Sequence, residues 1–435
     1  MRRDIVHIGA GELHYEICSI ADIARDLEEL DRNIYWENIG DPIMKGEKPP
    51  QWLKDIVAEA LKGDAVYAYS PTKGMLASRE YLADASNRQG GTDISPDDII
   101  FFNGLGDAVS KVFGLLKRTA RVLVPSPGYM TFAAAEASHA GTHAVPFYLD
   151  PTDNWLPDLT DLENRIKHNP SVAAVLLTNP ENPTGLVYPT EILETIVGLA
   201  KKYDLFVIFD EVYHNIVYNN QTSVALAELI GDVPGIAMKS ISKEMPWPGA
   251  RCGWIEVYNR KKDQYFENYI NSILNAKMLE VCSTTLPQTV LPKIVSHPGY
   301  KSFITDRVKR YETLANITYE MFCDTKGIIV NRSNGAFYMT IVLQDQRISQ
   351  QQSLPIESNQ IRSHIEKLVA TPTISNDTRF CYFLLGATGI CAVPLSSFNT
   401  ELQGFRITLL ETDEEIFVKL IKTLKASINQ YLASA

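Results

Sequence analysis

The stretch "LFVIFDEV" (205–212) places five apolar residues in front of an acidic pair. A near-continuous apolar run of this length is typical of a strand that is buried on both faces of a parallel sheet. Similar short runs recur through the middle of the chain, and longer amphipathic runs separate most of them. Strands that alternate with helices predict an α/β fold, with a mostly parallel sheet of about seven strands between helices. The expected strands are residues 98–104, 121–127, 143–149, 172–179, 205–212, 235–242 and 253–258.

The pattern changes after about residue 300, where a long polar helix precedes the apolar run "GAFYMTIVL" (335–343) and further mixed elements. This change predicts a second, smaller α+β domain. We therefore expect three parts. They are an N-terminal segment at 1–45 that packs with the small domain, a large domain at 46–300, and a small C-terminal domain at 301–435.

Composition limits the classes of function. The chain has 435 residues, 45% of them hydrophobic, and a net charge of −11, which argues against a nucleic-acid partner. No apolar run reaches the length of a membrane span, and the first residues lack the apolar core of a signal peptide. The six cysteines form no CxxC pair, so we expect reduced thiols, no metal site and a cytoplasmic location.

Polar residues follow several of the expected strands, at the sheet edge where ligands bind in such folds. Asp210 ends the apolar run, and a buried carboxylate there needs a partner such as a protonated ring nitrogen. A helix cap or an arginine explains the same acid equally well. Asn182 lies in "NPENPTG" (179–185), which the prolines make rigid. In "NGLGDAVSKVF" (103–113), glycines before a helix offer amides to an anion, although Val109 breaks the dinucleotide fingerprint.

The stretch "MKSISKEMPWPGARCGW" (238–254) contains Lys243 and, eight positions later, Arg251. A lysine that loses hydration near a strand end becomes a nucleophilic amine, and an arginine can clamp a phosphate. Taken alone, each cation is most simply explained as a surface charge. Their chemistry becomes specific only in combination with the motifs that precede them.

In this order, "NPENPTG", "DEVYHNIVY" (210–218) and "SISKEMPWPGARCGW" (240–254) resemble the fold-type I pyridoxal-phosphate aminotransferases of class I/II. The resemblance extends from "NIGDP" near residue 38 to "FRITLLE" (405–411), which is most of the chain. It implies pyridoxal 5'-phosphate as cofactor, an amino acid and a 2-oxo acid as partners, and a homodimer with shared active sites.

The resemblance also implies a role for each residue at the site. Lys243 corresponds to the Schiff-base lysine, Asp210 to the partner of the pyridine nitrogen, and Tyr213 to a donor to the ring's phenolic oxygen. The other implied cofactor contacts are Asn182 at the phenolic oxygen, Tyr129 stacked on the ring, Leu105, Gly106, Ser240 and Arg251 at the phosphate, and Tyr69 at the phosphate of the neighbouring subunit. The implied substrate contacts are Arg406 at the α-carboxylate, Gly40 and Asn182.

The activity implied is transamination, with Lys243 moving a proton between the substrate α-carbon and the cofactor. No arginine lies between Arg260 and Arg307, where relatives specific for dicarboxylates often supply one, so we expect a substrate with a neutral side chain. A second departure is Leu395 in "AVPLSSF" (392–398), where the family commonly has glycine; it leaves the shape of the substrate open.

Two other readings use the same constellation of residues. Carbon–sulfur β-lyases and amino-acid decarboxylases of this fold break a different bond at the α-carbon. A non-catalytic, effector-sensing domain is a remote alternative. Such regulators carry an N-terminal DNA-binding module, for which the region before residue 38 leaves no room.

Overall fold

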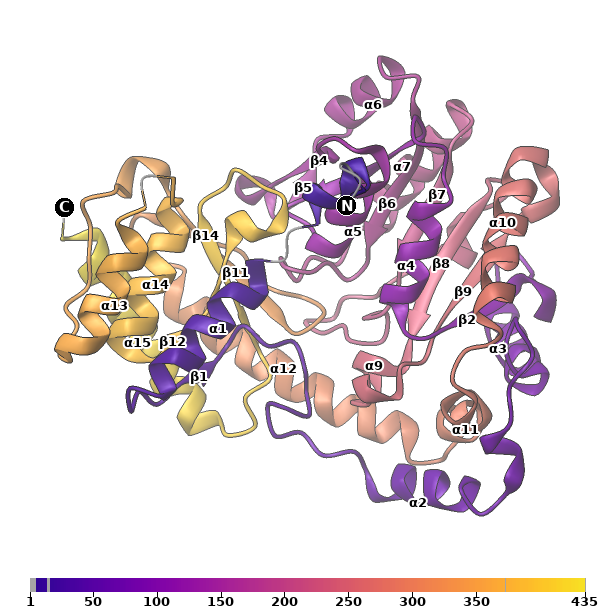
Figure 1. Ribbon diagram of the computed structural model, residues 1–435, viewed down its shortest axis with the longest axis horizontal. Coiled ribbons are helices and arrows are strands. Elements are labelled where there is room, and N and C mark those ends of the chain that lie inside the picture. The colour runs from indigo at the N-terminus through magenta and orange to yellow at the C-terminus, as the bar shows by residue number, and fades with distance from the viewer. Residues whose placement is uncertain (1–4, 14–15, 372, 435) are drawn as a thin grey trace.

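The computed structural model describes residues 5–13, 16–371 and 373–434, except for the side chains of residues 16–18. Its main feature is an eight-stranded sheet in the order β2-β9-β8-β7-β6-β3-β4-β5 (Figure 1). Strands β8, β7, β6, β3 and β4 are parallel, while β9 runs antiparallel to both of its neighbours and β5 runs antiparallel to β4. The strands are β2 (Ile99–Phe102), β3 (Arg121–Ser126), β4 (Val145–Asp150), β5 (Leu156–Pro157), β6 (Val172–Thr178), β7 (Phe206–Asp210), β8 (Gly235–Ser240) and β9 (Gly253–Tyr258).

All seven expected strands are present, so the predicted α/β class is confirmed. Alternate residues of the central strands enter different cores. In β7, for example, Ile208 packs with helices α4, α5 and α10, whereas Val207 and Phe209 pack with α2, α3, α6, α7 and α11. The helices are α2 (Gln51–Ala60), α3 (Leu76–Gln89), α4 (Leu105–Gly114), α5 (Met130–Ala140), α6 (Leu159–Lys167), α7 (Thr190–Lys202), α8 (Leu226–Leu229), α9 (Ile241–Glu244), α10 (Gln264–Glu280) and α11 (Thr285–Val295).

A second, four-stranded antiparallel sheet in the order β10-β11-β14-β13 lies at the other end of the molecule, with α13, α14 and α15 beside it (Figure 1). Apart from β13, whose Val393 lies in the core of the large sheet, these elements share one apolar core. They are β10 (Ile328–Val330), β11 (Tyr338–Leu343), α13 (Asn359–Val369), α14 (Asn376–Thr388), β12 (Ile390–Cys391), β13 (Val393–Pro394), β14 (Gly404–Thr408) and α15 (Glu414–Leu432).

The N-terminal segment contacts both parts of the molecule. A short 3-10 helix, Ile8–Glu12, lies against α5 beside the large sheet, whereas α1 (Glu16–Glu28) contacts α14 and β1 (Tyr35–Trp36) pairs with β12. Helix α12 (Tyr300–Phe322) runs between the two parts, with Ile304 in the core of the large sheet and Leu314 in the core of the smaller one (Figure 1). The boundaries expected after residues 45 and 300 stay predictions.

In the described part of the chain, no helix combines the length and the apolar character that a membrane crossing requires.

Candidate active site

Lys243 lies in α9, a four-residue helix that follows β8 directly. Its Nζ donates a hydrogen bond of 2.5 Å to the carbonyl oxygen of Gly40. Burial lowers the pKa of the Lys243 ammonium to about 8; the carboxylates of Asp41 and Asp210 oppose this effect, and the charges of Arg406 and Arg251 add to it. At pH 7, roughly a tenth of Lys243 is therefore the free amine that a nucleophile or proton carrier requires.

Asp210 is the last residue of β7, and only 4% of it is exposed. One of its carboxylate oxygens accepts a 3.1 Å hydrogen bond from the backbone of Val212, and no described residue forms a salt bridge with it. Burial raises the pKa of Asp210 to about 7; the nearby Glu211 carboxylate adds to the rise, while the Val212 amide and the Lys243 charge oppose it. This carboxyl is therefore placed to receive a cationic partner that the chain itself does not supply.

Arg406, in the middle of β14, is buried against the loop that contains Asn182. Its Nη1 donates to Asn182 Oδ1 at 3.2 Å, and its Nη2 donates to the carbonyl oxygen of Asn38 at 2.6 Å. The guanidinium also lies over two aromatic rings, 4.4 Å from the centroid of Tyr338 and 5.1 Å from that of Phe398. These contacts hold its planar fork in one orientation, as carboxylate recognition demands.

Tyr338 is a site residue that the sequence analysis missed. Its hydroxyl lies 3.0 Å from that of Tyr213, and a Cβ added at Gly40 would approach it to 2.2 Å. Burial raises the pKa of both tyrosines, so both stay protonated and can donate hydrogen bonds. Tyr338 therefore joins Tyr213, Gly40 and Arg406 into one wall. Tyr338 begins β11, inside the apolar run 335–343, and no local motif marks it as a site residue.

The loop before α4 lies beside Arg251. The Arg251 Nη2 donates to the Asn103 carbonyl at 3.4 Å, and a Cβ on Gly104 would come within 2.3 Å of that nitrogen. Gly104 adopts a φ of +80°, and its lack of a side chain permits this approach. The helix then begins at Leu105 and Gly106, whose backbone amides belong to the open first turn. A helix N-terminus beside an arginine is chemically suited to a phosphate group.

The remaining predicted residues lie in different settings. Ser240 caps α9: its hydroxyl accepts from the Ser242 amide at 3.0 Å and donates to the Cys252 carbonyl. Tyr129 is half-buried at the start of α5 and influences the pKa of both Tyr213 and Tyr338. Tyr69 is 84% exposed, so it is not brought into this chain's own site.

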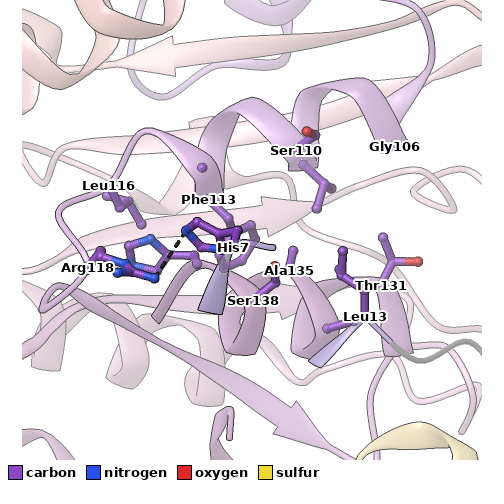
Figure 2. Close-up of a pocket in the computed structure, with 14 residues that line it drawn as sticks. His7, Leu13, Gly106, Ser110, Phe113, Leu116, Arg118, Thr131, Ala135 and Ser138 are labelled. Carbon is purple, nitrogen blue, oxygen red and sulfur yellow. Dashed lines mark hydrogen bonds between the residues drawn. The ribbon is translucent and has the colours of Figure 1, made fainter. Parts of the chain in front are cut away.

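Leu395 is fully buried in the core of the large sheet, beside Phe398, so its side chain does not shape the substrate mouth directly. A cavity of about 610 Å³ opens elsewhere, between α4 and α5, where His7 of the N-terminal segment lies near Phe113 and Leu13 lies near Thr131 (Figure 2). Gly106 is the only predicted site residue in its lining.

The residues present fit pyridoxal phosphate. The buried Asp210 suits a protonated ring nitrogen, the Lys243 amine suits an aldehyde, and Arg251 with the first turn of α4 suits a phosphate. Among the described residues, no group of three or more histidine, cysteine or acidic side chains is arranged to hold a metal. The individual roles stay predictions.

Comparisons with known proteins identify the family of the chain. A family model described as "Aminotransferase class I and II" matches residues 38–422. An uncharacterized aminotransferase of Methanocaldococcus jannaschii is 52% identical over 432 residues, covering 99% of this chain and 100% of that protein. The glutamate-pyruvate aminotransferase of Escherichia coli K12 is 29% identical over 321 residues, 73% of this chain and 76% of that protein. Alanine aminotransferase from Pyrococcus furiosus shares the fold, with a TM-score of 0.84 at 23% identity over 98% of this chain and 100% of that one.

Proposed function

Because the chain belongs to the class I and II aminotransferases, we propose that it moves the amino group of an L-amino acid with a neutral side chain to a 2-oxo acid, with Lys243 as the Schiff-base lysine. Enzymes of this family depend on pyridoxal phosphate. The observation that carries the proposal is geometric. The Lys243 amine donates to the carbonyl of Gly40, which lies against the Tyr338 hydroxyl, and the Arg406 guanidinium lies over the ring of the same tyrosine.

When bound, pyridoxal phosphate supplies an aldehyde for the Lys243 amine and a ring that accepts electrons from the substrate α-carbon. The chain's residues do the rest. Arg406 orients the substrate by its α-carboxylate, and Asn182 and the Asn38 carbonyl fix that guanidinium. The lowered pKa of Lys243 suits it to take a proton from the α-carbon and return it at the cofactor carbon.

The arginines around Lys243 support a neutral substrate side chain. Arg406 is assigned to the α-carboxylate and Arg251 to the phosphate. Arg307, behind α9, is already paired with the buried carboxylate of Glu47 at 2.7 Å. A second substrate carboxylate would thus be desolvated beside Tyr338 and Phe398 without a cation of its own, which is unfavourable.

We further propose a cytoplasmic homodimer in which Tyr69 reaches the partner's phosphate. Tyr67 and Tyr69 are 71% and 84% exposed, and the hydrogen bond from Ser70 to the Ser283 carbonyl holds their segment against the loop that follows α10. Near the end of α10, Leu279 is 89% exposed. Apolar side chains that gather on a surface mark a protein contact. The free thiols among the described cysteines suit a reducing compartment. Sedimentation of the purified protein as a monomer at micromolar concentration would contradict the shared site.

A half-reaction screen tests the activity. The protein is loaded with pyridoxal phosphate, and one amino acid at a time is added while the visible or near-visible absorbance band is followed. We expect neutral amino acids to convert to their 2-oxo acids without ammonia, at least about tenfold more efficiently than aspartate. Lys243→Ala should lack the band. Ammonia released from cystathionine would favour the lyase reading, and carbon dioxide the decarboxylase; a wild-type protein that stays colourless would end the proposal.

A further inference from the structure

Helix α9, which carries Lys243, is too short to satisfy its own last carbonyl groups. The final carbonyls of any helix lack partners within it, and four residues leave nearly all of them open. Here Arg307, from α12, supplies the donors: its Nη1 lies 3.0 Å from the carbonyl oxygen of Lys243 and also donates to that of Glu244. Arg307 thus caps the backbone of the lysine itself.

The other nitrogens of Arg307 are also engaged, so the side chain has little freedom. Its Nε donates to Glu47 at 2.7 Å, and its Nη2 donates to the Tyr311 hydroxyl at 2.7 Å. The Tyr311 hydroxyl in turn donates to Glu47 at 2.5 Å. Only 4% of Arg307 and 7% of Glu47 are exposed. A buried guanidinium with this many partners is held in a single geometry.

These contacts close a ring around Lys243. The lysine amine donates to the carbonyl of Gly40, the lysine carbonyl accepts from Arg307, and Arg307 pairs with Glu47, seven residues beyond Gly40. Both ends of the Lys243 residue are therefore tied to one short segment of chain. The strongest charges acting on the amine come from Asp41, Arg406, Asp210 and Arg251, so Arg307 reaches it through the backbone.

We propose that Arg307 is a positioning residue that fixes where the Lys243 amine stands. The inference rests on the proposed role of Lys243. Because α12 packs into both cores, Arg307 also ties the lysine's backbone to the helix that joins the two parts of the molecule. Misplacing a reacting group by about 1 Å can slow a reaction by about 100-fold. Loss of the cap should therefore slow proton transfer more than it weakens substrate binding.

Arg310 offers a matched control, because it also pairs with Glu47 from α12 but contributes no hydrogen bond to the carbonyls of α9. In the loaded enzyme, Arg307→Met should lower the half-reaction rate at saturating amino acid by about 10- to 100-fold. The apparent KM of Arg307→Met should stay within about threefold of wild type. For Arg310→Met, both the rate and the apparent KM should stay within about threefold of wild type. Arg307→Lys, which keeps one donor, should recover part of the rate.

A second measurement avoids the cofactor's chemistry. In protein freed of pyridoxal phosphate, the rate at which acetic anhydride modifies Lys243, followed by peptide mass spectrometry, should change in Arg307→Met and Arg307→Lys but not in Arg310→Met. The inference would be overturned if Arg307→Met and Arg310→Met lowered the half-reaction rate equally, or if Arg307→Met changed only the apparent KM. If Arg307→Met does not fold, the test rests on Arg307→Lys. A wild-type half-reaction rate and a wild-type rate of Lys243 modification in that variant would overturn the inference. A wild type without the absorbance band would instead overturn the proposed function.

Discussion

Replacing Asp210 with asparagine should affect the cofactor-free and the loaded protein in opposite directions. Burial raises the pKa of Asp210 to about 7 from an ordinary value of 3.8. At 1.36 kcal/mol for each pKa unit, that gap corresponds to about 4 kcal/mol. Since the folded-state pKa is the higher one, ionisation destabilises the fold progressively between pH 3.8 and 7 and fully above pH 7. Asparagine has no such ionisation.

We therefore expect cofactor-free Asp210→Asn to be more stable than wild type by up to about 4 kcal/mol at pH 9. At pH 5.5, which lies about midway between the unfolded and folded pKa values of Asp210, the expected difference is about 2 kcal/mol. Urea unfolding at both pH values measures this difference. In the loaded protein the carboxylate faces the proposed cationic ring, so the same variant should bind pyridoxal phosphate about 10- to 100-fold more weakly, the loss expected for a charged hydrogen bond.

Asp345→Asn is the matched control, because Asp345 is an exposed aspartate on the surface. It should change the free energy of unfolding by less than about 0.5 kcal/mol at either pH. The reasoning fails if Asp210→Asn gains no more stability at pH 9 than at pH 5.5, or if it binds the cofactor as tightly as wild type.

Two further outcomes follow from the site. Burial lowers the pKa of Lys243 to about 8, so in cofactor-free protein the rate at which Lys243 is acetylated should rise with pH, with a midpoint near pH 8. A midpoint of about 10.4, the value of surface lysines, would contradict the desolvation of Lys243. A Cβ at Gly40 would lie 2.2 Å from the Tyr338 hydroxyl, so Gly40→Ala should destabilise the fold by about 1–3 kcal/mol and slow the half-reaction. Adding Tyr338→Phe should relieve part of both effects, and additive losses in the double variant would show that the contact is not responsible.

The large sheet could be predicted from the sequence because its central strands are apolar on both faces. Runs such as residues 172–179 and 205–212 leave few alternatives to a buried parallel strand. The eighth strand, β5, is two residues long and carries no periodicity that could reveal it. The direction of β9 was also beyond reach, since an antiparallel strand at this place has the same buried pattern as its parallel neighbours.

The residues of the candidate site also fall into two groups. Local sequence motifs indicate some of them, whereas others contact the site from distant parts of the chain and lie in no motif. Lys243, Asp210 and Asn182 lie in dense local motifs that restrict the backbone, so the sequence could single them out as candidates. Arg307 acts on a residue 64 positions away, and Tyr338 meets Tyr213 across 125 positions. No local motif marks either residue, because α12 has several basic side chains besides Arg307 and Tyr338 begins a mostly apolar strand.

The hardest contacts to foresee are those made to backbone carbonyls. Arg406 is oriented by the carbonyl of Asn38, 368 positions away, and the Lys243 amine is received by that of Gly40. Every residue has a carbonyl group, so the identity of an acceptor residue contains no information about its use. Residues 38–40 serve as acceptors because their backbone runs between the two sheets. The ion pair of Glu47 with Arg307 holds one end of this segment in place. The buried ion pair of Glu37 with Lys45, at 2.6 Å, holds the other end. Lys243, in the helix that follows β8 of the large sheet, and Arg406, in β14 of the smaller sheet, therefore contact backbone carbonyls of the same short segment.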